Sequence, residues 1–199
     1  MVQTCYDEES VQLAELKSSI RKLIEIYDKI GSLISRKFSA YGSGNSWGET
    51  LERAESKVEP FSRTLSKLVK IRKKLHSSLT TLGNNLKSLE NAESVGEIST
   101  LIGLTVLADL SEYNDAAAHL MKSYENELLP IIPKLTNLLN IAATANETGK
   151  MINHLLDFNA TTGEDDFARM ATALRDRDID KFNRIYLKVK QRIEIEERH

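Results

Sequence analysis

The chain has 199 residues, of which 41% are hydrophobic, 28% charged and 6% aromatic, with nine glycines and three prolines. This composition excludes a disordered or collagen-like chain and leaves room for one or two hydrophobic cores. The single Cys5 cannot form an internal disulfide, so we expect a reducing, cytoplasmic environment. The most apolar window, Thr100 to Leu110, is about half the roughly 20 residues that span a membrane, so any membrane association is expected to be peripheral.

Charge is distributed unevenly along the chain. The formal net charge of −2 divides into −2 over residues 1–60, +6 over 61–90, −9 over 91–166 and +3 over 167–199. A nucleic-acid-binding protein needs positive charge without a large competing negative field, because it must neutralise phosphates. We therefore expect no nucleic-acid partner.

The first predicted element is a helix from about Ser10, as its N-cap, to Ala40. Apolar residues alternate there at spacings of three and four, which is typical of a coiled-coil seam. A glycine-rich cluster, 42–45, ends the pattern. The seam positions are Leu13, Leu16, Ile20, Leu23, Tyr27, Ile30 and Ile34.

The second predicted helix begins at a capping box made by Ser46 and Glu49, and the same repeat then continues from Leu51 to Leu89. Arg72 is its only charged seam residue and is expected to set register or to extend its head group toward water. Pro60 predicts a kink or a restart, since it lacks an N–H group and its ring clashes with the preceding turn. Gly83 is a second expected weak point.

After a connector, 91–97, the repeat resumes and predicts one third helix from about Ile98 to Asn159. Such a helix would be about 90 Å long and would bend near Pro130 and Pro133. In the last segment, the apolar residues from Phe167 to Ile193 change phase at 176–178, which predicts a short helix and then a longer one.

These elements define an all-α fold with no predicted strand. We expect an elongated antiparallel coiled-coil bundle of three long kinked helices in a single domain, 1–199. Residues 10–160 would form its three-helix core, and residues 164–199 would form a C-terminal helical extension.

Little in the sequence supports catalysis. The chain has four histidines and one cysteine, and only His199 has a Glu three positions before it, so the chain lacks the paired Glu-x-x-His motifs of a di-iron bundle. Asp115 and His119 share a helix face at i, i+4, which can hold a metal but is more typical of a surface contact. We expect no metal or cofactor and a non-enzymatic function. An enzyme would require a turnover that is lost when Asp115 or His119 is mutated.

The basic block of the second helix is the sharpest functional feature. Heptad geometry places five cations on the face opposite the seam. This face is either the solvated back of a coiled coil or a surface for anionic lipid head groups, which attract each nearby Lys or Arg by roughly 1 kcal/mol. The five residues are Arg63, Lys67, Lys70, Lys73 and Lys74.

Two segments, Leu75 to Glu90 and Tyr124 to Ile132, resemble the BAR (Bin/amphiphysin/Rvs) domain family, including its sorting-nexin members. The first has a leucine-rich helix with a central glycine, and the second has an aromatic residue followed by a leucine-proline step. The resemblance implies an antiparallel dimer with a curved six-helix body and a basic concave face, to which the five cations would contribute. The tip between the second and third helices carries Glu93 and Glu97 where many relatives are basic.

A homodimer is also expected from apolar residues that fall outside the predicted seam, because patches of this kind mark interfaces. We expect such an interface to bury about 2,000 Å² or more. Its predicted residues are Val69, Ile71, Ile102, Val106, Leu129, Ile132 and Leu139.

The sequence thus favours a membrane-binding, curvature-sensing or membrane-shaping module that acts as a homodimer on anionic membranes. The alternative is a helical adaptor, or a tethering or regulatory bundle, that binds another helix in a groove without contacting lipid.

Overall fold

The computed structural model describes residues 2–39, 62–130, 139–158 and 165–199, and all regular elements in these ranges are helical. The predicted all-α class is confirmed for this part of the chain. The elements are α1 (Val2–Ser39), α3 (Ser62–Ser88), the 3₁₀ turn η1 (Leu89–Asn91), α4 (Val95–Leu101), the π-helical turn η2 (Ile102–Val106), α5 (Leu107–Ser123), the π-helical turn η3 (Tyr124–Leu128), α6 (Leu139–Leu156), α7 (Asp166–Arg175) and α8 (Ile179–Glu197).

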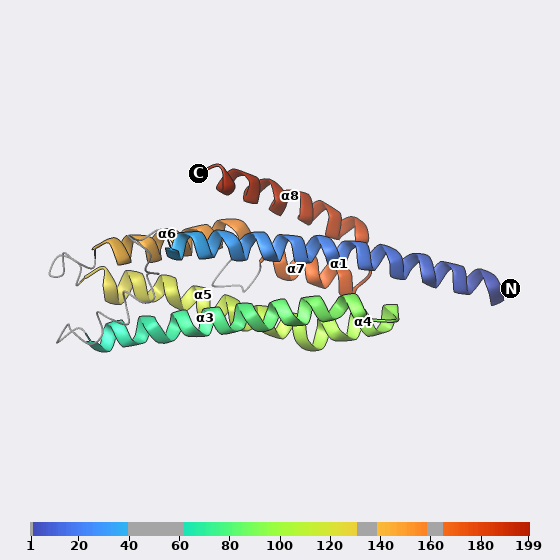
Figure 1. The fold of residues 1–199 in the computed structure, drawn as a ribbon, viewed down its shortest axis with the longest axis horizontal. Coiled ribbons are helices and arrows are strands. Elements are labelled where there is room, and N and C mark those ends of the chain that lie inside the picture. The colour runs from blue at the N-terminus through green and yellow to red at the C-terminus, as the bar shows by residue number, and fades with distance from the viewer. Residues whose placement is uncertain (1, 40–61, 131–138, 159–164) are drawn as a thin grey trace.

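The helices form a bundle whose cross-section has four helical positions arranged in a ring. α1 packs against α3, α3 against α5, α5 against α6, and α6 back against α1, so the ring of contacts is closed. α6 covers only one half of the fourth position, and α7 covers the other half by packing against α1, α5 and η2. α8 lies outside this ring on α1, α6 and α7, at the edge opposite α3 (Figure 1).

α1 buries a wider stripe than its predicted seam. Ile26 and Leu33 are buried in addition to Leu16, Ile20 and Leu23. The reason is that α1 contacts neighbours on several sides, whereas a two-helix seam needs only the a and d positions. The predicted start at Ser10 is wrong, because the helix begins at Val2 and Ser10 lies exposed within it.

α3 begins at Ser62, directly after the region that contains the predicted capping box, the glycine-rich cluster and Pro60; these lie outside the described residues. The expected weak point at Gly83 does not interrupt the helix. Its missing side chain instead makes room for Tyr27 of α1, whose ring Cζ would lie 2.7 Å from a Cβ at this position. Tyr27 Oη donates a hydrogen bond to the Leu79 carbonyl at 2.6 Å, which fixes the ring there.

The third predicted helix is correct only in its first half. Ser94 caps α4 by accepting a hydrogen bond from Glu97 N at 3.1 Å, and the chain stays helical through Leu128. A turn at Leu129 and Pro130 follows, and α6 packs against α5, so the single 90 Å helix is wrong. Pro130 explains the end of the helix, since its ring clashes with the preceding turn. Pro133 lies outside the described residues.

The two-part C-terminal prediction is confirmed. α7 ends at Arg175, Arg177 adopts a positive φ of 63°, and Asp178 caps α8 by accepting a hydrogen bond from Lys181 N at 2.9 Å. The predicted extension contributes to the common core, because Phe167, Met170 and other α7 residues are fully buried.

Most of the predicted dimer surface is buried within a single chain. Val69, Ile71, Ile102 and Val106 belong to the core, because α7 packs on η2 and α3 packs on η2 and α5. The prediction that these four residues form an exposed interface is therefore wrong. Leu129 is 48% exposed, and Ile132 and the side chain of Leu139 lie outside the described residues.

Candidate functional site: a cationic face on α3

α3 carries seven Lys and Arg residues and no Asp or Glu over its whole length. Its inner side buries Leu68, Leu75, Leu82 and Leu86 against the bundle. The hydrophobic pattern therefore fixes which way the helix faces, and the cations are left on the outside.

The five predicted lipid-binding residues all reach the surface. Arg63, Lys70, Lys73 and Lys74 are exposed, and the Lys67 side chain is 54% exposed. Spacings of four, three and four place Arg63, Lys67, Lys70 and Lys74 along one face, with Lys73 beside them. We call this set the α3 cationic face. Arg72, the charged seam residue, is half-buried, as expected for a side chain that extends toward water.

The acidic segment of the sequence packs against the basic one. Lys67 Nζ pairs with Glu127 of η3, and Asn85 of α3 donates to Asp109 of α5 at 2.6 Å. One ion pair, between Lys67 and Glu127, thus joins the basic segment 61–90 to the acidic segment 91–166. Glu127 partly neutralises the charge of Lys67, so the positive charge that faces solvent comes mainly from Arg63, Lys70 and Lys74.

A polar groove runs beside the cationic face, between α1 and α3. Its walls include hydroxyl groups and one exposed imidazole, that of His76, which lies one turn from Lys73. The lining residues are Tyr27, Asp28, Gly31, Ser32, Ser35, His76, Leu79 and Thr80.

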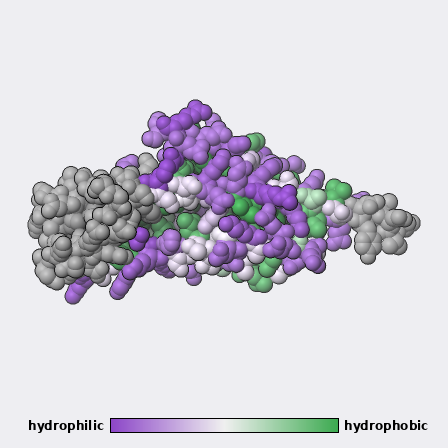
Figure 2. Space-filling model, in the orientation of Figure 1, coloured by the Kyte–Doolittle hydropathy of each residue, from purple (hydrophilic) through white to green (hydrophobic). Residues whose placement is uncertain are grey.

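On the face of the molecule seen in Figure 2, hydrophilic surface predominates and the hydrophobic patches are small and separate.

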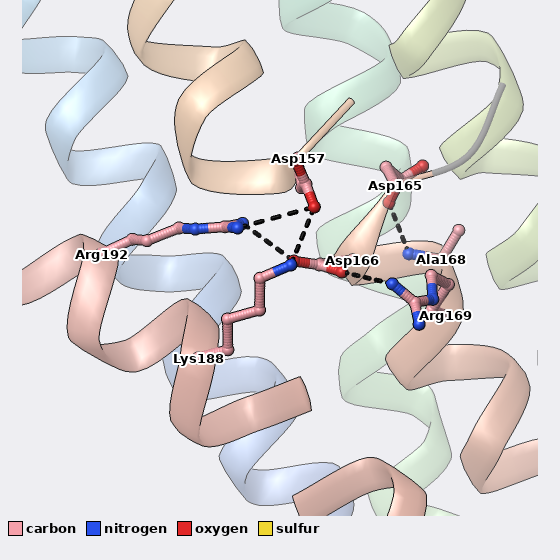
Figure 3. A network of polar contacts seen from close by, with 7 residues as sticks. All are labelled: Asp157, Asp165, Asp166, Ala168, Arg169, Lys188 and Arg192. Carbon is pink, nitrogen blue, oxygen red and sulfur yellow. Dashed lines mark hydrogen bonds and ion pairs between the residues drawn. The ribbon is translucent and has the colours of Figure 1, made fainter. Parts of the chain in front are cut away.

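A second polar cluster joins α8 to the ends of α6 and α7 (Figure 3). At its centre Asp166, only 1% exposed, contacts Arg169 at 3.0 Å, Lys188 at 2.9 Å and Arg192 at 2.8 Å. Asp157, which has a positive φ of 49° after the end of α6, contacts Lys188 at 2.8 Å. We call these five residues the α8 ion-pair cluster.

The charges within this cluster stabilise one another. The hydrogen bond from Lys188 holds the pKa of Asp157 below its ordinary value, and the bonds to Asp157 and Asp166 raise the pKa of Lys188. Both carboxylate oxygens of Asp166 contact Lys or Arg side chains, so the cluster is suited to holding α8 against α7 and the end of α6. Sequence reasoning missed this cluster, since its members are spread over 36 residues and no local spacing connects the α8 cations to Asp157 and Asp166.

Asp165, next to Asp166, is buried and caps α7. It accepts hydrogen bonds from Ala168 N and from the Asn114 side-chain amide of α5. Burial raises the pKa of the Asp165 carboxyl despite these hydrogen bonds. The sequence did contain a signal for this cap, because Asp165 comes just before the apolar residues of a short helix and aspartate is a preferred N-cap residue.

The structure does not assemble a metal site from the described side chains. Within that part of the chain, no three His, Cys, Asp or Glu residues come close enough to share an ion. Asp115 and His119 are both exposed on α5, as expected for a surface pair. Cys5 lies in the first turns of α1.

Comparison with protein-family models, curated proteins and solved structures finds no match to this chain. Among the helices that the structure describes, none is both long enough and apolar enough to cross a bilayer.

Proposed function

We propose that this protein is a non-enzymatic helical module that binds anionic membrane surfaces through the α3 cationic face. The observation that supports the proposal is a helix of 27 residues that has no acidic side chain and exposes five of its seven cations on one side, the α3 cationic face. When the outer face of a helix serves only to keep the protein soluble, it usually carries both acidic and basic residues. A face with basic residues alone is less common.

The expected binding is peripheral and sensitive to salt. Arg63, Lys70 and Lys74 would each contribute roughly 1 kcal/mol near an anionic leaflet, or about 3 kcal/mol together. The cytoplasmic leaflet carries the anionic lipids, so the protein would act there. Salt screening would weaken the attraction, because the cations are exposed and act over about a Debye length.

Curvature sensing is not part of this proposal. The BAR resemblance associates that activity with an elongated three-helix body, and here α6 folds back along α5. What we retain from the resemblance is the docking of a basic helical face on lipid.

Co-sedimentation with phosphatidylserine-containing vesicles tests the proposal. The triple variant Arg63→Glu/Lys70→Glu/Lys74→Glu should keep its helical circular dichroism, since the three side chains are exposed. Its binding should fall at least about a hundredfold. Lys67 stays unchanged, because reversing it would create repulsion with Glu127.

The matched control reverses three exposed cations elsewhere, Lys122, Arg177 and Arg198, and changes the net charge equally. It should bind nearly as well as the wild type. Equal losses in both triple variants would contradict a specific face. Unchanged binding in the α3 variant would favour the second candidate function, a helical adaptor that does not contact lipid.

A further inference from the structure

The outward side of α8 carries a short apolar row. Leu187 is 63% exposed and Ile195 is 44% exposed, and the exposed Gln191 lies midway between them. Residues at i, i+4 and i+8 form one ridge on a helix surface. The other large exposed aliphatic residues of the described chain are scattered: Val11 lies on α1, Leu104 on η2 and Leu129 in the turn after η3.

The same helix is electrically polarised along its length. Five cations and no acid lie between Lys181 and Arg192, and three glutamates follow at 194, 196 and 197. Acidic residues near a helix C-terminus are unfavourable, because the helix dipole is negative there. Glu196 lies 3.9 Å from His154, whereas the half-exposed Glu194 carboxylate has no ion pair within the described residues.

We propose that this row binds a second copy of the chain, with the two α8 helices crossing antiparallel about a two-fold axis at Gln191. Leu187 of each copy then packs against Ile195 of the other, so the contact is self-complementary, as a two-fold interface requires. Ridges of i±4 spacing pack at about −50°, the commonest class of helix crossing.

Charge selects the antiparallel arrangement. It places the cationic half of each α8 against the glutamates of the other copy, whereas a parallel pair would oppose like charges. A two-fold axis at Gln191 sets Glu194 of each copy opposite Lys188 of the other, so Glu194 would gain a cationic neighbour that also belongs to the α8 ion-pair cluster. The α3 cationic face lies at the opposite edge of the bundle, so the dimer does not depend on the proposed lipid binding (Figure 1).

The dimer should be weak and concentration-dependent. One helix crossing buries less than the roughly 1,200 Å² at the lower end of stable interfaces. We therefore expect self-association in the micromolar range or above.

Sedimentation velocity over a range of concentrations tests the surface. The wild type should shift from monomer to dimer, and Leu187→Glu/Ile195→Glu should remain monomeric over the same range. The control Val11→Glu/Leu104→Glu, which replaces two exposed residues on other elements, should dimerise like the wild type. A wild type that stays monomeric throughout, or a dimer that survives the α8 substitutions, overturns the proposal.

A cysteine experiment tests the geometry. In a Cys5→Ser background, Gln191→Cys lies on the two-fold axis and should form an intermolecular disulfide on mild oxidation, since bridged Cα atoms lie within about 7 Å. Arg184→Cys lies about 10 Å along the helix from the axis and should remain reduced. Equal cross-linking at both positions would indicate a parallel pair and overturn the antiparallel arrangement.

Discussion

The half-buried Tyr27 of α1 and the fully buried Tyr113 of α5 use their hydroxyl groups differently. Tyr27 Oη donates to the Leu79 carbonyl, whereas Tyr113 Oη is buried and has no hydrogen-bond partner within the described residues. Burial also raises the pKa of Tyr113 well above its ordinary value, so this hydroxyl stays neutral. An unpartnered buried hydroxyl costs desolvation energy with no compensating bond.

The two tyrosines therefore predict opposite outcomes for the same substitution. Tyr113→Phe should leave the free energy of unfolding unchanged or raise it, because the ring stays and only the unpartnered hydroxyl is lost. Tyr27→Phe should lower it by about 1 kcal/mol, the usual net value of one hydrogen bond. Urea denaturation followed by circular dichroism measures both, and a larger loss for Tyr113→Phe would show that its hydroxyl has a partner in solution.

At the residue scale, the sequence predicted exposure better than polar contacts. Heptad positions correctly identified the cations of α3 as outward residues. They could not reveal that the buried Asn114 donates to Asp165, which lies 51 residues further along the chain. Such a contact depends on the arrangement of helices, which residue spacing alone does not determine.

Two glycines in neighbouring helices show how one residue type serves different purposes. Gly83 of α3 lies directly against the Tyr27 ring, whereas a Cβ at Gly31 of α1 would have no atom within 4 Å. Only the first glycine is required by packing.

Alanine at these two positions should therefore change stability in opposite directions. Gly31→Ala should raise the free energy of unfolding by about 0.5–1 kcal/mol, because alanine is the better helix former. Gly83→Ala should lower it by about 1–3 kcal/mol, since the added methyl group displaces Tyr27. Thermal denaturation of both variants provides the comparison, and a stabilised Gly83→Ala variant would mean that the contact is looser than described.

At the element scale, periodicity located most described helices but misjudged one connection. The repeat continues across Pro130, so it predicted a single helix where the chain reverses. A 3.5-residue pattern reports which face of a segment is apolar, and it carries no information on whether the next segment continues or folds back. Ile102 and Val106 were misassigned for the same reason, because α7 covers them only after the reversal.

The attachment of α8 is a property of the whole molecule. The α8 ion-pair cluster joins three helices, and its members differ in burial: Asp166 is 1% exposed at its side chain, and Asp157 is 54% exposed. Breaking a buried charge pair leaves the remaining charges without compensation, whereas exposed pairs contribute little.

We therefore expect the same Asp→Asn substitution to lower the free energy of unfolding by different amounts at these two positions. Asp166→Asn should lower the free energy of unfolding by about 3 kcal/mol, because it leaves Arg192, Lys188 and Arg169 facing a neutral group. Asp157→Asn should cost less than about 1 kcal/mol. Chemical denaturation gives both values, and hydrogen exchange should show faster opening of α8 in the first variant. Equal losses of unfolding free energy in the two variants would mean that the buried Asp166 carboxylate is not the main stabilising member of the α8 ion-pair cluster.

The positions of α3 and α8 at opposite edges of the bundle have a consequence for valency. A dimer that meets at α8 would present its two α3 faces outward, on opposite sides of the particle. Both faces could not then lie on one flat bilayer, so dimerisation would add little avidity for a single vesicle. The dimer would instead link two vesicles, and vesicle clustering would increase with protein concentration in parallel with self-association.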